Sequence, residues 1–172
     1  MQSFDCIKMV VTMNPCPCGY YPDMNKCRCT SGQVTGYLNK LSQPLLDRLD
    51  LCADAEQVSF SSLNGKEGEC SAVIRERVEK VHRIQQERYK KEKIHFNGEL
   101  QGKKIESYCR TDTQAKLLLE KAFDQMGFSA RAYHRILKVA RTIADMDGSE
   151  LIRRQHVGEA LSYRAFEKKY WL

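Results

Sequence analysis

The stretch SARAYHRILKVARTIAD, from Ser129 to Asp145, decides how the second half of this chain folds. Its apolar side chains recur at steps of three and four residues, the spacing that places them on one face of an α-helix. Ser129 stands just before that run, and serine is a preferred cap for a helix N-terminus. The stretch therefore predicts an amphipathic helix, with an apolar face formed by Tyr133, Ile136, Leu137, Ala140, Ile143 and Ala144.

Helical patterns continue on both sides of this stretch. Upstream, a long helix is expected over residues 71–93, with Ile74, Val78, Val81 and Ile84 on one stripe, followed by a break at 97–102. Further helices are expected over 112–126, which Gly127 ends, and over 153–167, after Gly148. All four prolines of the chain lie before residue 45. We therefore expect a compact bundle of about four helices from residue 62 to residue 172.

The first part of the chain has a different pattern. The apolar, β-branched run from Ile7 to Met13 predicts a buried strand, which ends at Asn14-Pro15 because proline cannot donate to a sheet. A loop rich in cysteine and proline follows, then a short helix over 33–41 and a second short strand from Val58 to Phe60. A polar segment over 61–68 marks the boundary. The predicted fold is mainly α with a small α/β portion, divided into domains 1–61 and 62–172.

Composition and charge limit the classes of function. The 172 residues carry 28 Lys and Arg against 22 Asp and Glu, a net charge of +6, which permits contact with nucleic acid or nucleotide phosphate without requiring it. No run approaches the roughly 20 apolar residues that span a bilayer, and no signal peptide is recognisable. We therefore expect a cytoplasmic protein that does not associate with membranes.

Four cysteines form the most distinctive local cluster. Cys16, Cys18, Cys27 and Cys29 lie within a loop rich in proline and glycine. Four thiolates can converge on one tetrahedral Zn²⁺, and a metal would stabilise a loop with little apolar content of its own. Each pair has one intervening residue, whereas structural zinc sites favour two. Free thiols in a loop, a disulfide, or a metal other than zinc are the alternatives that the residues leave open.

Three polar residues are further candidates. Asn14 follows the predicted strand, where an amide can orient water or contact a phosphate; the alternative is a turn before proline. Arg48 projects from a leucine-rich segment, either as a rigid arginine that acts on a phosphate or as a surface ion pair with Asp47 or Asp50. Arg131 lies in the first turn of the helix after Ser129, where it can bind phosphate or remain a solvated charge.

The sequence contains no phosphate-binding loop of the G-x-x-x-x-G-K-[ST] type. It also contains no apolar run that ends in paired acids and could hold Mg²⁺. None of its four histidines lies in a metal-binding or catalytic-triad motif. We therefore do not expect this stretch of chain to be an enzyme by itself.

Several motifs, taken in order, resemble the magnesium-chelatase-like AAA+ ATPases of the ComM/YifB family. They are MNPCPCGYY at 13–21, CRC at 27–29, LLDRLDL at 45–51, IRERV at 74–78 and the stretch at 129–145. The resemblance covers essentially the whole chain. It implies that residues 1–61 end a AAA+ core and that 62–172 form a four-helix lid domain of the magnesium-chelatase C-terminal type.

The family resemblance also implies roles for individual residues. Asn14 matches the sensor-1 position, Arg48 the arginine finger that reaches a neighbouring subunit's site, and Arg131 the sensor-2 arginine of the lid, which contacts ATP phosphate. Gln43 departs from the glycine expected before Pro44. The segments that bind ATP and Mg²⁺ are expected ahead of residue 1, so we expect this chain alone to be inactive.

The parent protein that the resemblance implies is a bacterial, ring-forming ATPase, commonly a hexamer, that acts on DNA. ComM-like proteins are linked to natural transformation and resemble branch-migrating helicases. Two alternatives remain open. One is a zinc-stabilised helical module that binds nucleic acid or protein, which would lack an upstream phosphate-binding loop. The other is a true magnesium-chelatase motor subunit, which would work with partner chelatase subunits.

Overall fold

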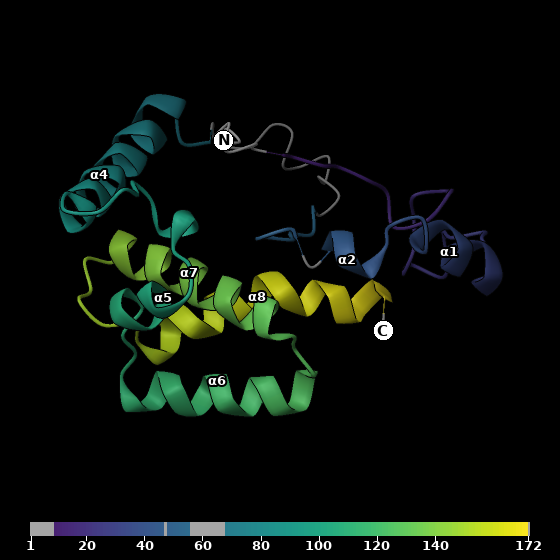
Figure 1. Ribbon diagram of the computed structural model, residues 1–172. Helices are drawn as coiled ribbons and strands as arrows, with labels where there is room; N and C mark the ends of the chain where they lie inside the picture. The colour runs from purple at the N-terminus through teal and green to yellow at the C-terminus, as the bar shows by residue number, and fades with distance from the viewer. Residues whose placement is uncertain (1–8, 47, 56–67, 172) are drawn as a thin grey trace, which may run out of the picture.

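The computed structural model describes residues 9–46, 48–55 and 68–171, and these residues form seven α-helices and no strand. The expectation of a mainly helical chain is confirmed. Two short helices, α1 (Ser31–Leu38) and α2 (Gln43–Leu46), follow the cysteine-rich loop (Figure 1). The remaining elements are α4 (Ser71–Tyr89), the 3-10 turn η1 (Asn97–Glu99), α5 (Lys103–Tyr108), α6 (Thr113–Met126), α7 (Ala130–Met146) and α8 (Arg154–Trp171).

Helix α7 is the centre of the bundle, as its pattern predicts. The Ser129 hydroxyl accepts a hydrogen bond from the Ala132 backbone N–H at 3.2 Å, so the predicted cap is present. The helix packs against α4, α5, η1 and α8, and α6 packs against α8 (Figure 1). On the predicted apolar face, Ile136, Leu137, Ala140 and Ala144 are buried, and Tyr133 and Ile143 pack against the same core.

The helix ends are set by short-range signals. The Asp112 carboxylate accepts the Ala115 N–H at 2.7 Å and caps α6. Gly127 adopts φ +60°, a left-handed conformation that glycine reaches without a steric penalty, and α6 ends there as expected. Gly148, with φ +66°, follows the end of α7.

Helix α4 begins at Ser71 as predicted, but it ends earlier and is buried along less of its length than predicted. It stops at Tyr89, four residues before the expected Lys93, because Gln85 and Tyr89 bond to Asn97 and fold the chain back. Its first ten residues are all exposed, and Ile74 and Val78 keep 44% and 43% of their surface in solvent. The predicted stripe is therefore buried only from Val81 onward, since no described element covers the first half of the helix.

The predicted buried strand is not formed by residues 9–13, the part of it that the structure describes. These residues have no ladder partner, and Val10 is 93% exposed. A strand needs a neighbouring strand for its backbone N–H and C=O groups, and the described residues supply none. Ile7 and the second predicted strand, Val58–Phe60, lie outside the described residues. No described helix is long and apolar enough to cross a membrane.

Candidate functional site

The four cysteines of the loop converge on one point. The Cys16 Sγ lies 3.4 Å from that of Cys18 and 3.8 Å from that of Cys27, and the Cys18 and Cys27 Sγ atoms are 3.6 Å apart. When the Sγ atom of Cys29 is included, all four sulfurs lie within 4.8 Å of one another. A tetrahedron with metal–sulfur bonds of about 2.3 Å has edges of about 3.8 Å, so the cluster has the size of a four-cysteine metal site.

These cysteines are free thiols in the structure. The Sγ separations among Cys16, Cys18 and Cys27, 3.4 to 3.8 Å, are well beyond the roughly 2.05 Å of a disulfide bond. The disulfide alternative is therefore not what the fold adopts. The cluster is a group of four thiols that can hold a metal ion.

Local backbone structure positions the cluster. A turn bond from the Gly19 N–H to the Cys16 carbonyl, 3.0 Å long, folds the first pair, and Gly19 has φ +83°. The second pair runs directly into α1, whose N-cap Thr30 forms a reciprocal capping box with Gln33. The buried side chains of Val34 and Leu38 on α1 form a small core with Cys16.

The pKa values of two of the four thiols, Cys16 and Cys18, are lowered by backbone N–H groups. Hydrogen bonds from the Tyr20 and Arg28 backbone N–H groups lower the pKa of Cys18 to about 6. Burial opposes ionisation of Cys16, but the N–H groups of Tyr21, 3.4 Å from its Sγ, and Cys18 lower its pKa as well. Both thiols are thus prepared to become thiolates, the form that binds a metal.

The other two thiols hold their protons more tightly. The Cys18 backbone N–H favours the Cys29 thiolate, but burial and the neighbouring Cys18 and Cys16 sulfurs raise the pKa of Cys29 to about 12. The Cys29 backbone N–H acts on Cys27 in the same way, and burial and the same two sulfurs again raise its pKa. Four thiolates in one place repel one another, and the attraction of a divalent cation at their centre to all four would outweigh that repulsion.

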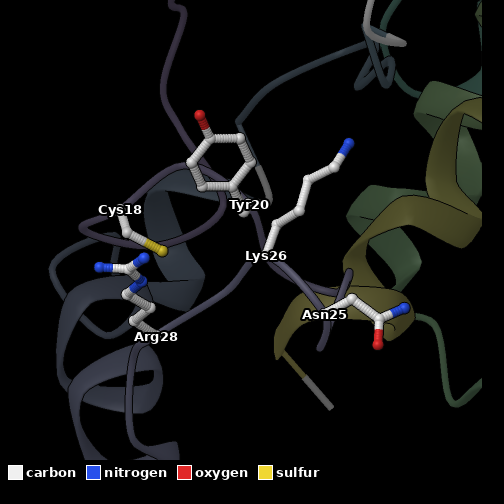
Figure 2. A pocket seen from close by; sticks show the side chains of 5 residues that line it. All are labelled: Cys18, Tyr20, Asn25, Lys26 and Arg28. Atoms are coloured by element: carbon white, nitrogen blue, oxygen red, sulfur yellow. The ribbon is translucent and has the colours of Figure 1, made fainter.

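A shallow polar hollow adjoins the cysteine cluster (Figure 2). It is lined by Cys18, Tyr20, Asn25, Lys26 and Arg28. In Figure 2 the Cys18 thiol and the Arg28 guanidinium point into the same space, whereas the Asn25 amide is directed away. Tyr20 is 44% exposed, and the Lys26 ammonium lies 3.7 Å from the Asp23 carboxylate, an open surface pair. The hollow therefore combines an accessible aromatic ring with two cations.

Asn14 is exposed and lies beside the cysteine loop. A Cβ placed on Gly19 would come within 3.7 Å of the Asn14 side-chain amide, so that amide covers the Gly19 backbone. No hydrogen bond or ion pair joins Asn14 to Arg48 or Arg131 within the described residues. The structure therefore places Asn14 with the cysteines and does not bring the three polar candidates into one cluster.

Arg48 lies just beyond α2 and is exposed. Its guanidinium donates to the Pro44 carbonyl at 2.6 Å, and its backbone N–H donates to the Leu45 carbonyl at 2.9 Å. Asp50, one of the two expected ion-pair partners, binds Arg135 of α7 instead; Asp47, the other, lies outside the described residues. The Arg48 side chain is thus folded over the end of α2, at the surface.

Arg131 is exposed in the first turn of α7 and makes no ion pair with any residue that the structure describes. Arg135, one turn later, forms the ion pair with Asp50. The helix that carries Arg131 is therefore attached to the segment that carries Arg48. This attachment joins residues 85 positions apart in the sequence.

Comparison with known proteins decides the family. The profile described as "Magnesium chelatase, subunit ChlI C-terminal" matches residues 68–164, more than half of the chain, and the profile "Magnesium chelatase, subunit ChlI" matches residues 3–63. The chain belongs to the magnesium-chelatase-like ComM/YifB family.

Individual relatives of the ComM/YifB family align over almost the whole chain. Competence protein ComM of Haemophilus influenzae is 45% identical over 160 residues, 92% of this chain and 30% of the relative. The uncharacterized protein YifB of Escherichia coli is 40% identical over 163 residues, 94% of this chain and 31% of the relative. An uncharacterized protein of Mycobacterium tuberculosis is 32% identical over 91% of this chain and 31% of the relative. The chain spans about a third of the length of these relatives.

Sequence reasoning missed a buried polar network in the part that matches the C-terminal profile. Asp145 is fully buried and receives hydrogen bonds from both terminal nitrogens of Arg88, from Asn97 at 2.9 Å and from Arg141 at 3.1 Å. The Arg88 guanidinium has a raised pKa because of its hydrogen bonds to Asp145. Asn97 also donates to Thr142 at 2.9 Å. The only signal in the sequence is polar residues on the inner faces of α4 and α7.

Proposed function

We propose that the protein to which this chain belongs is a ring-forming AAA+ ATPase that couples ATP hydrolysis to action on DNA. Family membership supports the assignment, and one relative is named a competence protein. The observation that carries it is the placement of Arg48, an exposed guanidinium on a short segment tied to α7. A surface arginine held at a defined place is what an interaction with a neighbouring subunit's ATP requires.

The three polar residues would have different roles in ATP hydrolysis. Arg48 would meet the γ-phosphate of ATP bound by the next subunit and stabilise the negative charge that develops during transfer to water. Asn14 would orient the attacking water or contact the γ-phosphate through its amide. Arg131, free of competing carboxylates among the described residues, would contact an ATP phosphate from the first turn of α7. ATP and Mg²⁺ themselves would be held by segments outside this chain.

The test is the rate of ATP hydrolysis by assembled, family-length subunits that contain this chain. Arg48→Ala should lower kcat about a thousandfold, the scale of other arginine fingers, and leave ATP binding largely intact. Arg48→Lys should restore little, because an ammonium lacks the planar fork. Arg110→Ala is the matched control, since Arg110 is another exposed arginine, paired at the surface with Glu150. An unchanged kcat in Arg48→Ala would refute the role.

We further propose that the ion held by the cysteine cluster is Zn²⁺. Four thiolates in a tetrahedron of this size fit zinc, which would act as a structural metal for the loop. Protein purified without chelator under reducing conditions should contain about one zinc per chain by elemental analysis. Cys18→Ser should abolish that content, whereas Cys70→Ser, at an exposed cysteine outside the cluster, should not. Zinc-free protein with four titratable thiols in the loop would contradict the proposal.

The hollow beside the cysteines supports a contact with single-stranded DNA. An exposed ring on which a base can stack, next to two cations, is the chemistry that single-strand binding uses. Fluorescence anisotropy with a labelled oligonucleotide should show salt-dependent binding to this chain that Tyr20→Ala and Lys26→Ala weaken. Lys116→Ala, on the exposed side of α6, is the control. The same result in a parent protein without a phosphate-binding loop would favour the alternative, a zinc-stabilised binding module.

A further inference from the structure

We propose that Arg135 is a positioning residue for Arg48, and that its ion pair with Asp50 fixes the segment on which Arg48 lies. The inference rests on the proposed role of Arg48 in ATP hydrolysis. Among the described residues, no hydrogen bond or ion pair joins Arg135 to Asn14, Arg48 or Arg131. It would act through Asp50, two residues beyond Arg48 in the chain.

Contacts on both sides tie the Arg48 segment to the helical bundle. Before Arg48, the buried Arg164 of α8 donates to the Leu46 carbonyl at 3.3 Å. After it, the Cys52 backbone N–H donates to the Tyr163 carbonyl of α8 at 3.2 Å. Asp50, which pairs with Arg135, lies between these two attachment points in the sequence. Arg135 therefore holds the segment from α7, between two points at which α8 holds it.

The position of Arg48 depends on these attachments because its own contacts are local. Among the described residues, the hydrogen bonds of Arg48 go from its side chain to the Pro44 carbonyl and from its backbone N–H to the Leu45 carbonyl. From Arg48 to Ala55 the described chain has no regular secondary structure. A displacement of this segment therefore moves the guanidinium with it. Misplacing a reacting or stabilising group by about 1 Å can cost up to about a hundredfold in rate.

The ion pair also keeps Asp50 away from Arg48. An acid two residues from an exposed arginine is a natural partner for it, and such a pair would hold the guanidinium at the protein's own surface. Asp50 is bound by Arg135 instead, whose side chain is only 20% exposed. Burial lowers the pKa of Lys138, the next cation along α7, and the nearby Asp50 carboxylate partly offsets that effect. Lys138 is already bound to the carbonyls of Gly98 and Leu100.

The experiment measures ATP hydrolysis by assembled, family-length subunits with single and combined substitutions. Arg135→Ala and Asp50→Asn should each lower kcat about tenfold with KM for ATP nearly unchanged, as expected for a displaced rather than a removed group. The charge-swapped double variant Arg135→Asp with Asp50→Arg should recover most of the rate. In an Arg48→Ala background, Arg135→Ala should cause no further loss. Arg110→Ala again serves as the surface-arginine control.

The outcomes separate this inference from the proposed function. Loss of activity in Arg48→Ala, together with a wild-type rate in Arg135→Ala and Asp50→Asn, would overturn the positioning role alone. A wild-type rate in Arg48→Ala would defeat the proposed function first. An equal further loss from Arg135→Ala in the Arg48→Ala background would show that Arg135 acts independently of Arg48. Asp50→Asn guards against misfolding, because the Asp50 side chain is 67% exposed.

Discussion

The cysteine-rich region, residues 9–46, and the helical region, residues 68–164, are stabilised in different ways. In the helical region thirteen buried apolar residues form one core, whereas the core cluster of the described cysteine-rich region has three, and one of those is Cys16. A segment with so small a core needs another source of stability. The helical region holds itself together, and the cysteine-rich region is arranged around a place for a metal ion.

Removing the metal should produce the largest difference in stability between the two regions. Structural zinc sites contribute roughly 10 kcal/mol or more to folding, so a chelator should unfold the cysteine loop and α1. Hydrogen exchange should then become fast at Val34 and Leu38 and stay slow at Ala140 in α7. Because protons compete for the thiolates, zinc affinity should fall as the pH is lowered. Equal protection at Val34 with and without chelator would remove the contrast between the regions.

Breaking the buried ion pair of Arg88 with Asp145 tests how the helical region is stabilised. Arg88→Ala leaves the buried Asp145 carboxylate without its main partner, which should reduce the free energy of unfolding by about 3–5 kcal/mol. The exposed pair of Arg77 with Glu69 is the matched control, and Arg77→Ala should cost under about 1 kcal/mol. Urea denaturation followed by circular dichroism measures both. Similar losses in the two variants would show that the network does not stabilise the bundle.

The smallest effect is expected at the junction of α7 and α8. The Asp147 carboxylate lies 3.1 Å from His156 Nε2 and accepts from Gln155 at 3.0 Å, and His156 is the main cause of its lowered pKa. Because the pKa is lowered, the charged Asp147 carboxylate stabilises the fold at any pH above its ordinary pKa of 3.8. This contribution is lost as the pH falls through the lowered pKa. Asp147→Asn should therefore reduce the melting temperature slightly at pH 7, and it should have no such effect at a pH below the lowered pKa. The same reduction at both pH values would rule out this charge effect.

Local signals explain what could be predicted from the sequence. The Ser129 cap, the apolar face of α7 and the stop at Gly127 depend on residues within a few positions of one another, and the structure has all three. The cysteine cluster was predicted as a set because its four residues share one loop, which leaves few ways to arrange them.

Long-range pairings explain what could not be predicted. Arg88 and Asp145 are 57 positions apart, and Arg135 and Asp50 are 85 apart, so neither pair leaves a periodic signal. The predicted strand failed over residues 9–13 because strand formation depends on a partner, and no local pattern supplies one. Similarly, the apolar stripe of α4 correctly indicated a helix, but it did not reveal which half would be covered.

The central claim, that Arg48 acts on ATP held by a neighbouring subunit, is tested most directly by mixing two inactive proteins. One carries Arg48→Ala, and the other is a family-length subunit in which the phosphate-binding loop that the proposal places outside this chain is disabled. In a mixed ring, some interfaces pair an intact loop with an intact Arg48, so ATP hydrolysis should rise well above that of either protein alone. No recovery at any mixing ratio, in rings shown to contain both subunits, would contradict action across the subunit interface.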